Sequence, residues 1–238
     1  MIDDTTGREI VKKEFHDKTS NIFRNTLVAL AEGITGIASS SKKDLILSIG
    51  HIFQRLRGGQ FLSQLSNEWN KYKEAGKIKD DYEFSEQHKV CLHELLDFLD
   101  KDIPDQMRFD LLKKIFILSA VENNSDSILP QLYMKVCRNI SSGSILILNA
   151  AYQITKERSL GTKKYKELGA SGWIDIIKEK SGLRYRSLVE IYEQELMEKR
   201  LISPREYSDR SGITIEPHFR LTDLGFNICS YIDNYEKI

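Results

Sequence analysis

Two segments of this chain are apolar on nearly every side, and they limit its fold more than any other feature. They are residues 111–121, LLKKIFILSAV, and residues 145–154, ILILNAAYQI. A helix without a polar stripe must be surrounded by other elements. Because strand-like alternation is nearly absent before residue 200, we expect those elements to be helices. The chain is therefore predicted to be mainly α, with an N-terminal helical bundle.

Helices with a single apolar face are predicted around these two segments. They are expected at residues 8–24, 42–56, 60–75, 85–99 and 129–140. Glycine is unfavourable inside a helix and favourable just after its end. The Gly58–Gly59 pair is therefore expected to end the second of these helices, and Gly76 the third.

Three residues are predicted to begin helices, namely Ser85 and Ser127 as N-caps and Pro104 as a first helical residue. The helix after Ser85 places six side chains on one apolar face: His88, Cys91, Leu92, Leu95, Leu96 and Leu99. The helix after Ser127 is expected to do the same with Leu129, Leu132, Tyr133, Val136, Cys137 and Ile140. Both faces should line the bundle core.

The composition changes between residues 156 and 172, KERSLGTKKYKELGASG, which holds three glycines and few large apolar side chains. Such a stretch is typical of a domain boundary. We predict a helical bundle domain at residues 1–158, a basic glycine-containing linker at 159–171 and a second domain at 172–238.

The second domain has the layout of a winged helix. Helices are predicted at 173–180 and 183–199, the latter with Tyr185, Leu188, Val189, Tyr192 and Leu196 on its apolar face. Leu201-Ile202 and residues 213–221 are the predicted strands of a two-stranded wing, and Thr222 is the expected N-cap of a last helix. Leu196, Leu201, Leu221 and Phe226 should pack together, with Arg210 in water at the loop tip.

The residues LMEKRLIS and FRLTDLG resemble the winged-helix ending of the MarR and PadR regulator families. The matching positions are Leu196, Leu201, Ile202, Leu221, Thr222 and Gly225. The resemblance implies a winged-helix fold, which serves both DNA-binding regulators and protein-binding modules. Through residues 129–154 and this ending, the overall layout also resembles bacterial abortive-infection alpha-type proteins, which implies a role in phage defence.

The charged residues of this domain give evidence both for and against DNA binding. Helix-turn-helix proteins read bases with the start of their second helix and hold phosphates from nearby segments. Those candidates are Arg184, Arg186 and Ser187 for bases, and Lys163, Lys164, Lys166, Arg205, Arg210 and Arg220 for phosphates. Residues 156–186 hold nine basic and four acidic residues, a net charge of +5. Against DNA stand Glu190 and Glu193, which we place on the outward face of the same helix.

No sequence pattern indicates an enzyme, a metal site or a cofactor. Phosphate-binding glycine loops, zinc-protease motifs and nucleophile elbows are absent from the sequence. His88, Cys91 and His93 are close together, but His93 points away from the face that the other two share, so we interpret them as core and surface residues. The acidic pairs Asp80–Asp81 and Asp100/Asp102 are interpreted as solvated caps, and His218 as a wing surface residue.

Three widely spaced cysteines, Cys91, Cys137 and Cys229, form no disulfide pattern and fit a reducing cytoplasm. We see no signal peptide. The apolar stretch at residues 26–38 is shorter than a bilayer requires and contains Glu32, so a buried helix is favoured over a membrane-active segment.

We therefore expect a non-enzymatic interaction or regulatory protein with an unknown protein partner, working in phage defence if the layout resemblance holds. The alternatives are a DNA-binding transcriptional regulator, which would hold double-stranded DNA through residues 163–220, and a membrane-active defence effector. The overall balance of 35 basic and 35 acidic residues excludes a polybasic binding mode for the whole chain. A homo-oligomer is left open.

Overall fold

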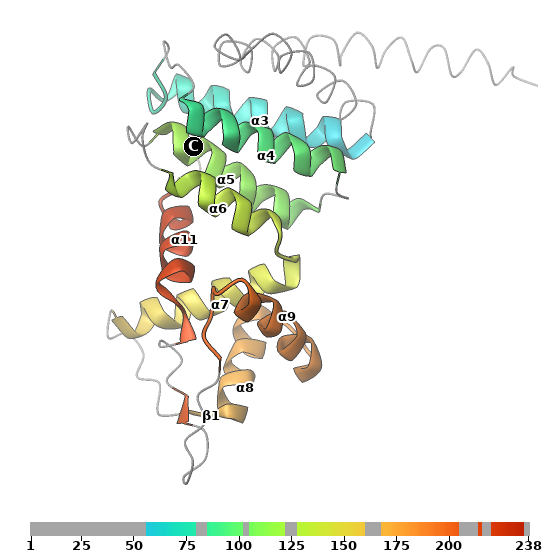
Figure 1. Ribbon diagram of the computed structural model, residues 1–238, viewed down its shortest axis with the longest axis vertical. Coiled ribbons are helices and arrows are strands. Elements are labelled where there is room, and N and C mark those ends of the chain that lie inside the picture. The colour runs from blue at the N-terminus through green and yellow to red at the C-terminus, as the bar shows by residue number, and fades with distance from the viewer. Residues whose placement is uncertain are drawn as a thin grey trace, which may run out of the picture. The chain divides into compact units, whose positions relative to one another are not determined.

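The computed structural model describes residues 56–79, 85–101, 105–121, 128–159, 168–204, 214–215 and 220–235. Within these residues the chain forms eight helices and two strands of two residues each (Figure 1). The prediction of a mainly helical chain is confirmed. The predicted helix at 8–24, the apolar stretch at 26–38 and all but the last residue of the predicted helix at 42–56 lie outside the described residues.

The helices are α3 (Leu56–Glu74), α4 (Glu86–Lys101), α5 (Gln106–Val121), α6 (Leu129–Arg138), α7 (Ser142–Ser159), α8 (Ala170–Ser181), α9 (Arg186–Glu198) and α11 (Asp223–Asp233). The strands β1 (Leu168–Gly169) and β2 (Thr214–Ile215) pair in antiparallel fashion, with Leu168 opposite Ile215. The chain divides into two compact units. Unit 1 comprises Met1–Pro104, Ser119–Gln131 and Lys237–Ile238, and unit 2 comprises Asp105–Leu118 and Leu132–Glu236.

In unit 1, α3 buries the face predicted for the helix at 60–75: Phe61, Leu62, Leu65, Trp69 and Tyr72. Gly76 follows the helix with a φ of +68°, as expected of a terminating glycine. The Gly58–Gly59 pair does not end a helix, because α3 begins at Leu56 and contains both glycines. Burial of the following apolar face offsets the cost of glycine, about 1 kcal/mol each.

Helix α4 follows its predicted pattern in full. The Ser85 hydroxyl accepts a hydrogen bond from the backbone N–H of His88 at 3.2 Å, which confirms the N-cap. All six side chains predicted for its apolar face are buried. The His88 ring stacks on Trp69 of α3, with 5.7 Å between ring centroids, so the histidine serves core packing between these two helices.

Helices α5 and α6 depart from prediction at their ends. The Asp105 carboxylate accepts from the Arg108 N–H at 3.0 Å, so Asp105 is the N-cap of α5. Pro104, predicted as the first helical residue, lies outside the described residues. Ile115, Phe116, Ile117 and Leu118 are consecutive and buried, so α5 is enclosed as expected. In α6, Leu129 and Leu132 are exposed. The buried side chains of α6 are instead Tyr133, Met134 and Cys137, and Ile140 is buried just after the helix ends.

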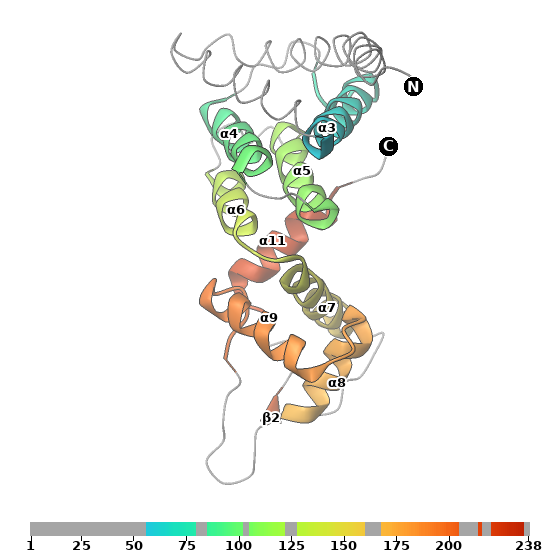
Figure 2. The same ribbon diagram turned by 90° about the vertical axis from the view of Figure 1, so that its right-hand side faces the viewer.

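Helix α7 is the central helix of unit 2, and it contacts α8, α9 and α11 (Figure 2). Its buried side chains include Ile145, Ile147, Leu148, Ala151 and Ile154, as its apolar sequence predicts. The predicted domain boundary at residue 158 would separate α7 from α8 and α9, whereas unit 2 contains all three. The division into domains at 1–158 and 172–238 stays a prediction.

Candidate interaction surface

The two helices of the predicted helix-turn-helix are α8 and α9, and they contact each other. Gly182, with a φ of +73°, follows α8. Helix α9 begins at Arg186, three residues later than predicted, because Tyr185 has an extended backbone with φ −106° and ψ 133°. The Tyr185 side chain forms no cap hydrogen bond. The start of α9 therefore follows a short connection without a side-chain cap from Tyr185.

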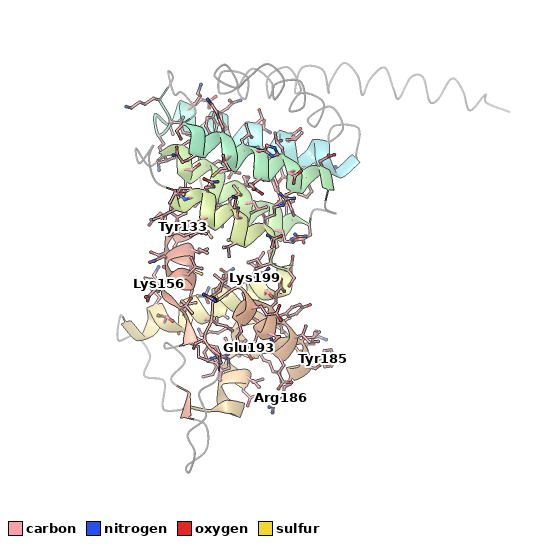
Figure 3. All side chains as sticks on the ribbon, in the orientation of Figure 1. Tyr133, Lys156, Tyr185, Arg186, Glu193 and Lys199 are labelled. Carbon is pink, nitrogen blue, oxygen red and sulfur yellow. The ribbon has the colours of Figure 1, made fainter. Side chains whose placement is uncertain are left out.

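The outer face of α9, defined here by Arg184, Tyr185, Arg186, Ser187, Glu190 and Ile191, is exposed. Three of these residues, Arg184, Arg186 and Ser187, are the predicted base-contacting residues. Tyr185 was predicted to be part of the apolar core face, but it is 67% exposed, and Ile191 is 61% exposed. Figure 3 labels Tyr185 and Arg186 at the start of α9.

The charges on this face are partly paired. The Arg186 Nε lies 2.9 Å from Glu190 Oε1, one helical turn away, and both side chains are exposed. Such a surface ion pair contributes about 0.3–0.5 kcal/mol at most. A carboxylate at this place weakens the attraction of Arg186 for phosphate.

The prediction that Glu193 lies on the outward face is wrong, because Glu193 is buried on the inner face of α9 with Val189 and Leu196. Its carboxylate accepts hydrogen bonds from the Trp173 indole and from the Arg220 guanidinium. Arg220, predicted to contact phosphate, is likewise buried. The structure thus corrects Arg220 from a surface residue to an internal partner of Glu193.

The Leu-Thr-x-x-Gly motif, Leu221 to Gly225, has a local physical reason in this structure. The Thr222 hydroxyl accepts from the Gly225 N–H at 3.1 Å, which confirms Thr222 as the N-cap of α11. A Cβ on Gly225 would lie 2.2 Å from the carbonyl oxygen of Leu201, so this close approach requires glycine. The motif joins the start of α11 to the residues that follow α9.

The predicted two-stranded wing is not seen within the described residues, which include only residues 201–202, 214–215 and 220–221 from its two strands. Ile202 and Leu221 form an isolated antiparallel bridge, and Ser203 donates to the Arg220 carbonyl at 2.5 Å. Thr214–Ile215, within the predicted return strand, pairs with β1. Leu196, Leu201 and Leu221 are buried as predicted. Phe226 is instead 40% exposed, with its ring 5.6 Å from that of Tyr152.

Five predicted phosphate contacts lie outside the described residues: Lys163, Lys164, Lys166, Arg205 and Arg210. Asp80, Asp81, Asp102, Ser127 and His218 also lie outside them. Arg184, Arg186 and Ser187 therefore lie together at the start of α9, and Arg220 is buried. The other basic candidates stay predictions.

A second polar cluster, missed from the sequence, connects α9 to the start of α7. Glu195 accepts from the Ser141 N–H at 2.8 Å and from the hydroxyls of Ser141 and Ser144, each at 2.6 Å. Burial raises the pKa of Glu195, but the hydrogen bonds from both serines outweigh it, so the pKa is lowered overall. The Ser-Ser-Gly-Ser run is a recognisable helix start, yet its partner is 54 residues away.

Among the described residues, no group of three histidine, cysteine or acidic side chains could hold a metal ion. His88 and Cys91 are buried in α4, whereas His93 is exposed. No described helix is both long enough and apolar enough to cross a bilayer. All three cysteines are buried and free. Burial, with a smaller contribution from nearby acids, raises the pKa of Cys91 and Cys229 to about 12.

The outer face of α9, with the two residues that precede the helix, thus exposes Tyr185, Ile191 and both predicted base-contacting arginines. No protein-family model, curated protein or solved structure matches this chain.

Proposed function

We propose that this chain is a non-enzymatic interaction or regulatory protein, and that its outer face of α9 binds a protein partner. The observation that carries the proposal is the exposure of Tyr185 and Ile191, at 67% and 61%, among side chains of both charges. Tyrosine and arginine are enriched at protein interfaces, where aromatic anchors supply much of the affinity. A mixed-charge face with a paired arginine fits a protein surface better than a polyanion.

The module that presents this face is proposed to be a winged helix. Its support is the order of elements: α8 and α9 in contact, the Ile202–Leu221 bridge after α9, and α11 capped by Thr222. The pairing of β1 with β2 would add a third strand to the proposed wing. Burial of Leu196, Leu201 and Leu221 beneath it agrees with this layout.

A photo-crosslinking amino acid at position 191 tests the proposed surface in cells that naturally contain the chain. A matched control carries the same group at Asn149, an exposed position on α7. We expect one adduct from position 191 that is absent from position 149. With that protein purified, Tyr185→Ser with Ile191→Ser should weaken binding about tenfold or more. Identical adducts from both positions, or unchanged affinity, would overturn the proposal.

A second candidate, binding of double-stranded DNA, is favoured by one observation. Arg184, Arg186 and Ser187 are all exposed at the start of the second helix, where base-reading residues lie in helix-turn-helix proteins. The burial of Glu193 also removes one of the two carboxylates that counted against DNA. Duplex binding that falls steeply with salt, and that Arg184→Ala with Arg186→Ala weakens, would support it. No binding at low salt would exclude it.

A role in bacterial phage defence, in the cytoplasm, is proposed on the resemblance of layout alone. Its test is phage plating on bacteria that express the chain, with the Tyr185→Ser, Ile191→Ser variant as control. Protection that the variant loses would join the defence role to the outer face of α9. Equal plating with and without the chain would count against the defence role and leave the binding proposal to its own experiment.

A further inference from the structure

A buried charged cluster in unit 2 is not explained by any binding role of α9. It consists of Trp173 from α8, Glu193 from α9 and Arg220, which precedes α11. The side chains of Arg220 and Glu193 are only 3% and 2% exposed. Taking two charges out of water is costly, and a well-packed apolar pair of similar volume often stabilises a protein as well or better. The cluster therefore needs a reason other than net stability.

The guanidinium of Arg220 is used on three sides. Its Nη1 donates to Glu193, and its Nε and Nη2 donate to the Ser203 carbonyl at 3.3 and 3.2 Å. Its Cζ lies 4.8 Å from the centroid of the Trp173 ring. Only a planar fork of donors can satisfy these three directions together. A lysine ammonium offers three donors at a single atom and cannot replace it.

The cluster is closed by two further bonds. Glu193 Oε1 also accepts from the Trp173 indole, which ties α8 to α9. Ser203 donates back to the Arg220 carbonyl at 2.5 Å, which ties the residues after α9 to those before α11. Each bond is directional, so together they permit one arrangement of these four segments.

We propose that Trp173, Glu193 and Arg220 form a positioning junction, which fixes the direction in which the chain leaves α9 at Ser203 and returns at Arg220. The junction orients these segments relative to the inner face of α9 and adds little net stability. This role is independent of what the outer face of α9 binds, and it predicts that orientation and stability respond differently to the same substitutions.

The test compares Glu193→Met, the double variant Glu193→Met with Arg220→Met, and Arg220→Lys. The matched control is Arg186→Met with Glu190→Met, which removes the exposed ion pair from the same helix. Thermal denaturation gives stability. Amide hydrogen exchange by NMR at Ser203, and exchange of the Trp173 indole N–H, report the junction itself.

We expect Glu193→Met to lower the midpoint by about 6 °C or more, because it leaves a buried charge unpaired. The double variant should return to within about 4 °C of wild type, yet Ser203 and the Trp173 indole should exchange about tenfold faster or more. Arg220→Lys, which retains the charge, should also speed exchange at Ser203. The exposed control should change neither quantity.

Two results would overturn the proposal. A double variant that is as unstable as Glu193→Met, or that does not fold, would mean that the pair contributes net stability. Wild-type exchange at Ser203 in either the double variant or Arg220→Lys would mean that the junction does not position these segments.

Discussion

The two faces of α9 use the same kinds of side chain for opposite purposes. On the inner face, Glu193 is bonded to partners from α8 and the segment before α11, and on one side of the helix Glu195 is bonded to the serines at the start of α7. On the outer face, Glu190 pairs with Arg186, one turn away, and both side chains remain exposed. Burial makes the difference. An ion pair in water contributes little free energy, whereas a buried charge must keep its partner because an unpaired buried charge is costly. The inner face of α9 holds neighbouring segments in place, whereas the outer face is exposed and accessible to a partner.

The largest contrast is expected between Leu196 and Ile191, one side chain from each face. Leu196→Ala should destabilise the protein by about 2–5 kcal/mol, as leucine truncation in a packed core does. Ile191→Ala should cost less than about 0.5 kcal/mol, because its side chain is 61% exposed. Urea denaturation of both variants measures the contrast, and similar losses would mean that the two faces do not differ in packing.

The next effect tests the approach of the inner face to α7. A Cβ on Gly143 would lie 2.2 Å from the ring of Tyr192. Gly143→Ala should therefore cost about 1–3 kcal/mol through overpacking. Adding Tyr192→Leu should recover part of that loss, because the smaller side chain makes room. Denaturation of the two single variants and the double variant closes the cycle, and strictly additive losses would contradict this contact.

A smaller, pH-dependent effect is expected at Glu195. The pKa of Glu195 is lowered in the folded protein, mainly because the hydrogen bonds from Ser141 and Ser144 outweigh burial. Its contribution is therefore present above the unfolded pKa and is lost as pH falls through the folded pKa. Glu195→Gln should cost about 1–2 kcal/mol at pH 7, and the difference from wild type should shrink toward pH 3. Glu190→Gln is the outer-face control and should cost less than about 0.5 kcal/mol at either pH.

The smallest expected effect is a gain in stability just after the end of α9, where the chain leaves the helix. Arg200 has a φ of 58°, in the left-handed region that favours glycine. Its N–H donates to the Met197 carbonyl, and Leu201 donates to Leu196 at 2.9 Å, so the turn is well bonded. Arg200→Gly should stabilise the protein by about 0.5 kcal/mol, since relief of strain exceeds the entropy that glycine adds to the unfolded chain. A loss in thermal midpoint would show that the arginine side chain matters more than its backbone.

Local patterns in the sequence predict the helices well because their causes are local. The face of α4 is correct at all six positions, and Ser85 and Thr222 cap the helices they precede. Glu193 was misplaced although its spacing from Val189 and Leu196 matches the buried face. A charged residue is expected to face water, and this expectation decided the prediction against the spacing. The arginine that compensates the buried carboxylate is 27 residues away and cannot be recognised from the local sequence.

Other features of the candidate site depend on contacts that no short window contains. The exposure of Tyr185 follows from where α9 begins, which is set by the extended backbone before Arg186. The serines at the start of α7 are visible in the sequence, but Glu195 is not recognisable as their partner. In α6, the apolar residues outnumber the places on one buried face, so spacing alone did not decide between Leu132 and Met134.

The burial of every cysteine has a practical consequence for labelling. Burial raises the pKa of Cys91 and Cys229 to about 12 and also raises that of Cys137, so the thiols stay protonated at pH 7. Thiol reagents attack the thiolate, so the native protein should be almost inert toward maleimides. A cysteine introduced at Ile191 or Tyr185 would then carry a dye or spin label without removal of the natural cysteines. The wild-type thiols would react only as the protein unfolds, so their rate of labelling reports the rate of unfolding.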